Sequence, residues 1–193
     1  MSCRDLKLLE GQDFIVNTHE CDGERFRGLF RQSWDKIPVN ARKTILDYWK
    51  CRELAPSFEL SNLWGDSAHS YAQVIEMGYR MRFNAKSFSI MPEPPALFVI
   101  AHELAHVYNW ATGTSNALFR SFYEQNTDET EVHEKFDLEN EAKADALAVK
   151  WEFDKAKMDR FRMLEKMRGF EYACERMTCA PEVELSDEAE RES

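Results

Sequence analysis

The centre of this chain reads His102-Glu103-Leu104-Ala105-His106 and lies inside an apolar segment. Pro94 and Pro95 precede it and Gly113 follows it, a placement typical of the first turn and the C-terminal end of a helix. Residues four apart share one face of a helix, so both imidazoles can reach one ion while Glu103 lies beside them. The sequence therefore predicts a long helix that carries two metal ligands, His102 and His106, and a candidate base.

A catalytic zinc site needs a third protein ligand and an open position for water. Three histidines lie outside the motif: His19, His69 and His133. The last of them falls in the acidic stretch 128–137, which we interpret as a solvated loop or a helix start. A second helix offers a carboxylate instead, because Glu141 and Asp145 stand at i and i+4 and share one face. We expect Glu141 to reach the metal and Asp145 to hold the second ring nitrogen of a ligand histidine.

The two segments together resemble a known class of enzymes. The pattern His102-Glu103-x-x-His106 followed by Asn140-Glu141-x-x-x-Asp145 resembles the gluzincins, the thermolysin-type metallopeptidases. The run from Glu141 to Ala148 is similar to the small ImmA/IrrE-type proteases, in which a Glu-x-x-Ala-Asp-type helix follows the metal helix. The resemblance implies His102, His106 and Glu141 as zinc ligands, Glu103 as general base and Asp145 as an outer partner.

This resemblance covers residues 94–151 and departs from a minimal family member in one respect. Residues 107–140 separate the two motifs, so the fold must accommodate an inserted loop. The metzincin pattern fails, because Asn109 and Thr112 stand where a glycine and a third histidine are required. Two histidines and a carboxylate also suit iron(II) or manganese, but the adjacent base in this spacing favours Zn²⁺ as the cofactor.

The predicted function is that of a zinc-dependent endopeptidase acting on a protein or peptide substrate. Metal-activated water would attack the scissile carbonyl, with Glu103 as the general base. The alternative is a zinc-binding regulatory or protein-interaction module without hydrolytic activity. The oxyanion-stabilising residue has several candidates between which the sequence does not choose: Tyr71, Tyr79, Tyr108, Tyr123 and His133.

A basic cluster in the C-terminal part raises a third hypothesis, a protease that associates with DNA. Its members are Lys155, Lys157, Arg160, Arg162, Lys166 and Arg168. The chain has a net charge of −10, and charges on an amphipathic helix are usually solvated or paired with neighbours, so nucleic acid is not favoured as a partner.

The composition, 193 residues with 44% hydrophobic content, suits one sizeable core. We expect a loosely ordered arm at 1–22, one metallopeptidase domain at 23–178 and a disordered acidic tail at 179–193. The chain has five cysteines without a C-x-x-C pair, and this odd number favours a reducing cytoplasm. The longest apolar run is too short to span a bilayer, so we expect a cytoplasmic protein with no membrane association.

Periodicity predicts an α+β fold with a small, mostly antiparallel sheet packed against the two ligand-bearing helices, which is the minimal zincin-like arrangement that the resemblance implies. Further helices are expected at 24–34, 41–54, 137–151 and 154–177. Strands are expected at 14–16, 58–60, 71–75, 79–83 and 87–90, with turns at Gly78 and 84–86. The stretch 112–134 is expected to form a long loop that serves as a lid or a substrate wall.

Overall fold

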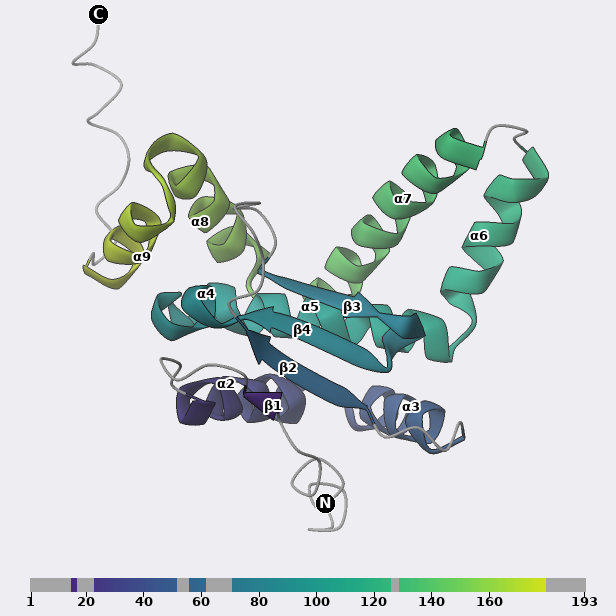
Figure 1. The fold of residues 1–193 in the computed structure, drawn as a ribbon, viewed down its shortest axis with the longest axis horizontal. Coiled ribbons are helices and arrows are strands. Elements are labelled where there is room, and N and C mark those ends of the chain that lie inside the picture. The colour runs from purple at the N-terminus through teal and green to yellow at the C-terminus, as the bar shows by residue number, and fades with distance from the viewer. Residues whose placement is uncertain (1–14, 17–22, 52–55, 62–70, 126–128, 180–193) are drawn as a thin grey trace, which may run out of the picture.

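One small mixed sheet and a larger set of helices make up the described part of the chain, so the fold is α+β as predicted (Figure 1). The computed structural model describes residues 15–16, 23–51, 56–61, 71–125 and 129–179. The sheet comprises β1 (Ile15–Val16), β2 (Ser57–Ser61), β3 (Ala72–Ile75) and β4 (Arg80–Asn84). Of the predicted arm at 1–22 the structure describes Ile15 and Val16, which pair with β2, and of the predicted tail at 179–193 it describes Cys179; the rest of both segments lies outside the described residues.

The expectation of a mostly antiparallel sheet is wrong. The strand order is β1-β2-β4-β3, and only β3 and β4 pair antiparallel, through the hairpin that contains the 3₁₀ turn η1 (Glu76–Gly78). The pairs β1·β2 and β2·β4 are parallel. Parallel neighbours need a long crossover, and two helices between β1 and β2 supply one. Alternation of polar and apolar residues identified the faces of these strands, but it carries no information on their direction.

The two faces of the sheet differ in chemistry. Phe58 and Leu60 of β2 lie beside Met81 and Phe83 of β4 in the strand register, and all four side chains are buried. On the opposite face Glu59 lies beside Arg82, and their side chains form an ion pair of 3.1 Å. The helices therefore pack on one face, and they create a single hydrophobic core with it.

The N-terminal helices α2 (Gly23–Lys36) and α3 (Val39–Lys50) supply the aromatic part of this core. Seven of the eight apolar residues that recur at helical spacing on these helices are buried, and Tyr48 is half-buried; the buried ones are Phe26, Leu29, Phe30, Trp34, Ile45, Leu46 and Trp49. The indoles of Trp34 and Trp49 stack with ring centroids 6.2 Å apart. Helix α3 begins after Pro38, so Asn40 lies in its first turn. The predicted end at Leu54 falls outside the described residues.

Residues 85–90 form a helix, α4 (Ala85–Ile90), so the strand predicted at 87–90 and the turn predicted at 84–86 are wrong. Asn84 caps this helix, because its side-chain oxygen accepts a hydrogen bond of 3.1 Å from the backbone N–H of Ser87. A strand would bring Phe88 and Ile90 to one face. Instead Phe88 is buried while Ile90 is 44% exposed, which is the result of helical spacing.

The predicted helix around His102 and His106 is confirmed as α5 (Glu93–Ala111), with proline in its first turn. It lies behind the sheet and contacts α2 and α3 on one side and three later helices on the other (Figure 1). Apolar residues such as Phe98, Ile100 and Leu104 are buried, and so are His102, Glu103, His106 and Asn109. Because α5 is buried on nearly all sides, its polar residues need partners within the protein.

The stretch expected to be a long loop folds as an antiparallel pair of helices, α6 (Thr114–Gln125) and α7 (Glu129–Lys150). Phe119 of α6 meets Phe136 of α7 edge to face at 5.4 Å, and Val132 is buried. Phe119 thus belongs to a helix–helix interface, and the prediction of a long loop at 112–134 is wrong for the residues that the structure describes. Helix α7 begins at Glu129, well before the predicted 137, and includes the acidic stretch around His133.

The predicted last helix is divided in two, α8 (Lys155–Arg168) and α9 (Phe170–Cys179). Gly169 separates them with φ of +93°, a conformation that favours glycine, and its N–H bonds to Glu165 O at 2.7 Å. Phe161 and Phe170 pack edge to face at 5.5 Å across the bend. None of the described helices has the length and apolar character needed to cross a bilayer.

Candidate metal centre

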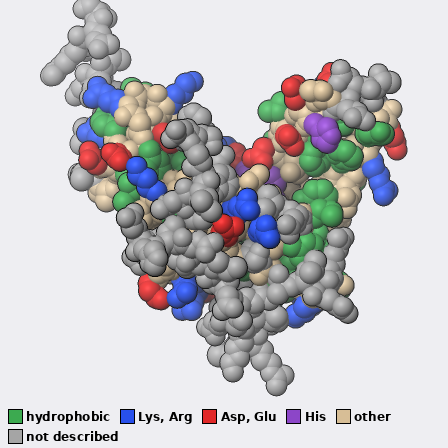
Figure 2. Space-filling model, in the orientation of Figure 1, with side chains coloured by type: hydrophobic (Ala, Val, Ile, Leu, Met, Phe, Trp, Pro, Cys, Tyr) green, Lys and Arg blue, Asp and Glu red, His purple; other side chains and the backbone are tan. Residues whose placement is uncertain are grey.

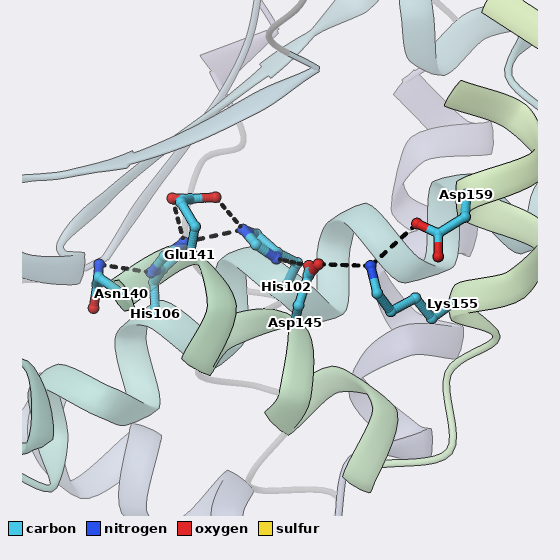
Figure 3. A network of polar contacts seen from close by, with 7 residues as sticks. All are labelled: His102, His106, Asn140, Glu141, Asp145, Lys155 and Asp159. Atoms are coloured by element: carbon cyan, nitrogen blue, oxygen red, sulfur yellow. Dashed lines mark hydrogen bonds and ion pairs between the residues drawn. The ribbon is translucent and has the colours of Figure 1, made fainter. Parts of the chain in front are cut away.

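The three predicted metal ligands meet at one point between α5 and α7 (Figure 3). The Nε2 atoms of His102 and His106 lie 3.0 Å apart, as expected for residues one helical turn apart. Glu141 bridges them, with Oε2 3.0 Å from His102 Nε2 and Oε1 3.1 Å from His106 Nε2. Both histidines are buried, whereas the Glu141 side chain is 62% exposed. The donor atoms therefore form a cluster with one open side.

Asp145 lies where the sequence analysis expected it, on the far side of the His102 ring. Its Oδ1 is 2.8 Å from His102 Nδ1 and accepts the ring N–H. With Nδ1 protonated, Nε2 carries the lone pair and points at the cluster. The same carboxylate accepts a hydrogen bond of 2.8 Å at Oδ2 from Lys155 Nζ, and Lys155 also lies 3.1 Å from Asp159 (Figure 3).

Asn140 holds the other histidine, and sequence reasoning assigned it no role. Its side-chain amide lies 3.1 Å from His106 Nδ1, and its Oδ1 accepts from the buried hydroxyl of Ser115 at 3.0 Å. Rotation of the amide by a half turn presents Oδ1 to a protonated Nδ1, and Ser115 can donate or accept in either case. Both histidines thus have a side-chain partner on Nδ1, which leaves both Nε2 atoms for the cluster.

The charges of the cluster shift its pKa values strongly. Burial alone would lower the pKa of His102, but hydrogen bonds to Asp145 and Glu141 raise it to about 9. The two histidines lower the pKa of the Glu141 carboxyl well below its ordinary value. Burial opposes ionisation of Asp145, yet His102 and Lys155 bring its pKa to about 2. The pocket accordingly favours positive charge between the imidazoles and the carboxylates.

Glu103 is buried beside the cluster, and burial raises the pKa of its carboxyl group. The backbone of Val74 in β3 lies near this carboxyl group and opposes part of that rise in pKa. A carboxyl group with a raised pKa, next to a candidate metal position, is well placed to accept and return a proton. Its position also links the metal helix to the sheet.

The strand that carries Val74 lies at the edge of the sheet. The Asn84 N–H donates to Tyr71 O at 2.8 Å, and hydrogen-bonded pairs alternate along an antiparallel ladder. Gln73 and Ile75 therefore bond with β4, while the backbone of Ala72 and Val74 points to the open edge. Because the Val74 backbone also lies near Glu103 and β3 contacts α5, this edge lies beside the candidate metal centre.

The centre lies at the floor of a hollow in the surface. Figure 2 shows two lobes, formed by α8 and α9 on one side and by α6 and α7 on the other, with a histidine side chain visible between them. Ser115 lies in α6, Glu141 in α7 and Lys155 in α8, so both lobes contribute residues to the network around the centre. Of the three candidate ligands, Glu141 is the exposed one, so the cluster has one side that is not covered by the described residues.

The residues listed as oxyanion candidates have other contacts. The Tyr71 hydroxyl bonds with Glu165, Tyr79 stacks on Tyr48, and Tyr108 meets Trp151 edge to face. Tyr123 is 57% exposed on α6, and His133 packs beside Phe119.

Comparisons of this chain with family models, curated proteins and solved structures found no match.

Proposed function

We propose that this protein is a zinc-dependent endopeptidase of the zincin-like type. The observation that carries the proposal is the convergence of His102 Nε2, His106 Nε2 and the Glu141 carboxylate beside a buried Glu103, at the floor of a hollow. The resemblance of the two helices to gluzincins and to ImmA/IrrE-type proteases supports the same function.

The donor set fits a zinc ion. Two imidazole nitrogens and one carboxylate form a three-ligand set that leaves a fourth position for water, and the remaining ring nitrogens are held by Asp145 and Asn140. Protons on the imidazoles hold these groups together through hydrogen bonds to Glu141, and a divalent cation would take the place of those protons. Zinc bound there would lower the pKa of its water toward about 7 and polarise the substrate carbonyl.

Glu103 is assigned the role of general base and then of general acid. It would take a proton from the attacking water and return it to the leaving amine, as its raised pKa favours. Glu103 lies on the same helix as His102 and His106, directly after the first of them, so the α5 backbone keeps its carboxyl group beside the cluster.

The open edge of β3 is the proposed binding site for an extended peptide. Backbone groups of Ala72 and Val74 point toward the centre and can pair with a substrate strand. Such pairing would hold a peptide bond beside Glu103 through main-chain contacts alone. The substrate class is therefore a protein or peptide segment that can adopt an extended conformation.

Metal content is the first test. Elemental mass spectrometry of the purified protein should find zinc in equimolar amount, and His102→Ala and Glu141→Ala should each lose it. Lys143→Ala, which changes a half-buried residue of α7 that pairs with Glu139 outside the cluster, is the control and should retain zinc. A wild-type protein that stays metal-free after zinc is supplied would refute the proposed site.

Hydrolysis is the second test, and it separates an enzyme from a zinc-binding module. Glu103→Gln should retain zinc and lower cleavage of a peptide library by about 10²- to 10⁴-fold, because it removes the general base. Equal cleavage by both proteins would reject the role of Glu103. Zinc binding without any cleavage by the wild type would favour the regulatory module.

A further inference from the structure

The basic cluster that the sequence places at 155–168 contains one residue with a different environment from the others. Lys155 Nζ lies 2.8 Å from Asp145 Oδ2 and 3.1 Å from Asp159 Oδ1. It joins α8 to α7 across the candidate centre. Lys157, two residues later, is exposed and has no side-chain hydrogen bond or ion pair with any residue that the structure describes.

Each oxygen of Asp145 has its own partner. Oδ1 accepts from His102 Nδ1 at 2.8 Å, and Oδ2 accepts from Lys155 at 2.8 Å. A carboxylate with one partner can turn about its terminal bond, whereas contacts at both oxygens fix its plane. The orientation of the His102 ring therefore depends on Lys155 through Asp145.

Lys155 is itself held in place by the elements around it. It is the first residue of α8, directly after Asp154, whose side chain caps the helix by accepting from Lys157 N at 3.0 Å. The preceding residues Trp151 and Phe153 are buried, so the connection from α7 is anchored. The ammonium also lies 5.9 Å from the ring centroid of Phe98, one turn before His102 on α5.

A positive charge near a cation site would normally oppose metal binding. Here Asp159 lies 3.1 Å from the same ammonium and offsets its charge. Fixing Asp145 then outweighs repulsion, because Asp145 contacts the ligand His102 itself, while the charge of the ammonium is paired and lies farther from the ion position.

We propose that Lys155 is a positioning residue that holds Asp145 against His102 and thereby strengthens metal binding. This inference rests on the proposed metal site and goes beyond its ligands and their immediate partners. It also assigns one member of the basic cluster to the site and not to a nucleic-acid surface.

The test is the zinc dissociation constant of the full chain, measured by competition with a chelating indicator. Lys155→Met should weaken zinc binding about tenfold, the lower end of the range for outer partners of metal ligands. Lys157→Met is the matched control and should bind as the wild type does. Lys155→Arg, which keeps both charge and donors, should restore most of the affinity, which a loss of α8 packing alone would not explain.

Apo-protein melting temperatures accompany these measurements, and Lys155→Gln replaces the methionine variant if the latter does not fold. Unchanged zinc affinity in Lys155→Met, or an equal loss in Lys157→Met, would overturn the inference while leaving the metal site intact. Absence of zinc binding in the wild type would instead overturn the proposed function, and this inference with it.

Discussion

Two regions on opposite sides of α5 are built on different principles. One is the aromatic layer, which we define as Phe26, Phe30, Trp34, Trp49, Phe58, Phe83 and Phe88. The other is the polar network, which we define as His102, His106, Asn140, Glu141, Asp145, Lys155 and Asp159. In the aromatic layer the rings meet at centroid distances of 4.8 to 6.2 Å and at many angles. In the polar network each contact joins a particular donor to a particular acceptor.

The difference indicates that the aromatic layer stabilises the fold and that the polar network provides the groups for metal binding. Burial of apolar rings is favourable in many orientations, so the aromatic layer lowers the free energy of the fold without needing exact partners. Burial of histidines and carboxylates is costly unless every polar atom is paired. The polar network is therefore expected to contribute little to folding and to be retained for metal binding.

The largest effect is expected from the aromatic layer. Trp34→Ala removes a side chain that is 1% exposed and stacked on Trp49, and it should lower the free energy of unfolding by about 3–5 kcal/mol. Chemical denaturation measures this loss, with Val39→Ala, 66% exposed, as the control. The folded fraction should bind zinc with unchanged affinity. A parallel loss of zinc affinity would show that the two regions are not separate.

In the polar network we expect a smaller loss of stability, and a loss of zinc affinity that the aromatic layer does not show. Asn140→Ala removes the partner of His106 Nδ1 and should weaken zinc binding about 10- to 100-fold. The loss of its bond with Ser115 should cost only about 1 kcal/mol of stability. Competition with a chelating indicator and thermal unfolding measure the two quantities.

Asn116→Ala on the exposed face of α6 is the control for this substitution and should change neither quantity. If Asn140→Ala destabilised the protein strongly and left zinc affinity unchanged, the polar network would be a structural feature like the aromatic layer.

The sequence predicted the parts of this molecule that depend on local spacing. Helical periodicity identified the buried positions of α2 and α3, and the i, i+4 spacing placed His102 with His106 and Glu141 with Asp145. Such relations follow from the geometry of one helix, so no knowledge of the tertiary fold is needed.

The sequence did not predict contacts between elements that are distant along the chain. Ser115 and Asn140 come from α6 and α7, and Lys155 looked like one cation among six. Strand direction likewise depends on how helices cross over, which polarity alternation does not record. At 87–90 a short alternating run fits the strand pattern, but the cap that Asn84 forms favours a helix.

The smallest effect is expected where the two regions meet, at Gly78. Its carbonyl accepts from Trp49 Nε1 at 2.9 Å, and an added Cβ would lie 3.3 Å from the Val107 side chain, next to His106. The backbone φ of +91° also disfavours other residues, so Gly78→Ala should cost about 1–2 kcal/mol of stability. Gly28→Ala on the exposed side of α2 is the matched control and should stabilise the protein by up to about 1 kcal/mol.

Gly78 is the last residue of the turn between β3 and β4. Its substitution should therefore raise the KM for a peptide that pairs with β3 and leave zinc affinity unchanged. A loss of zinc affinity would mean that the sheet positions the metal helix as well as the substrate.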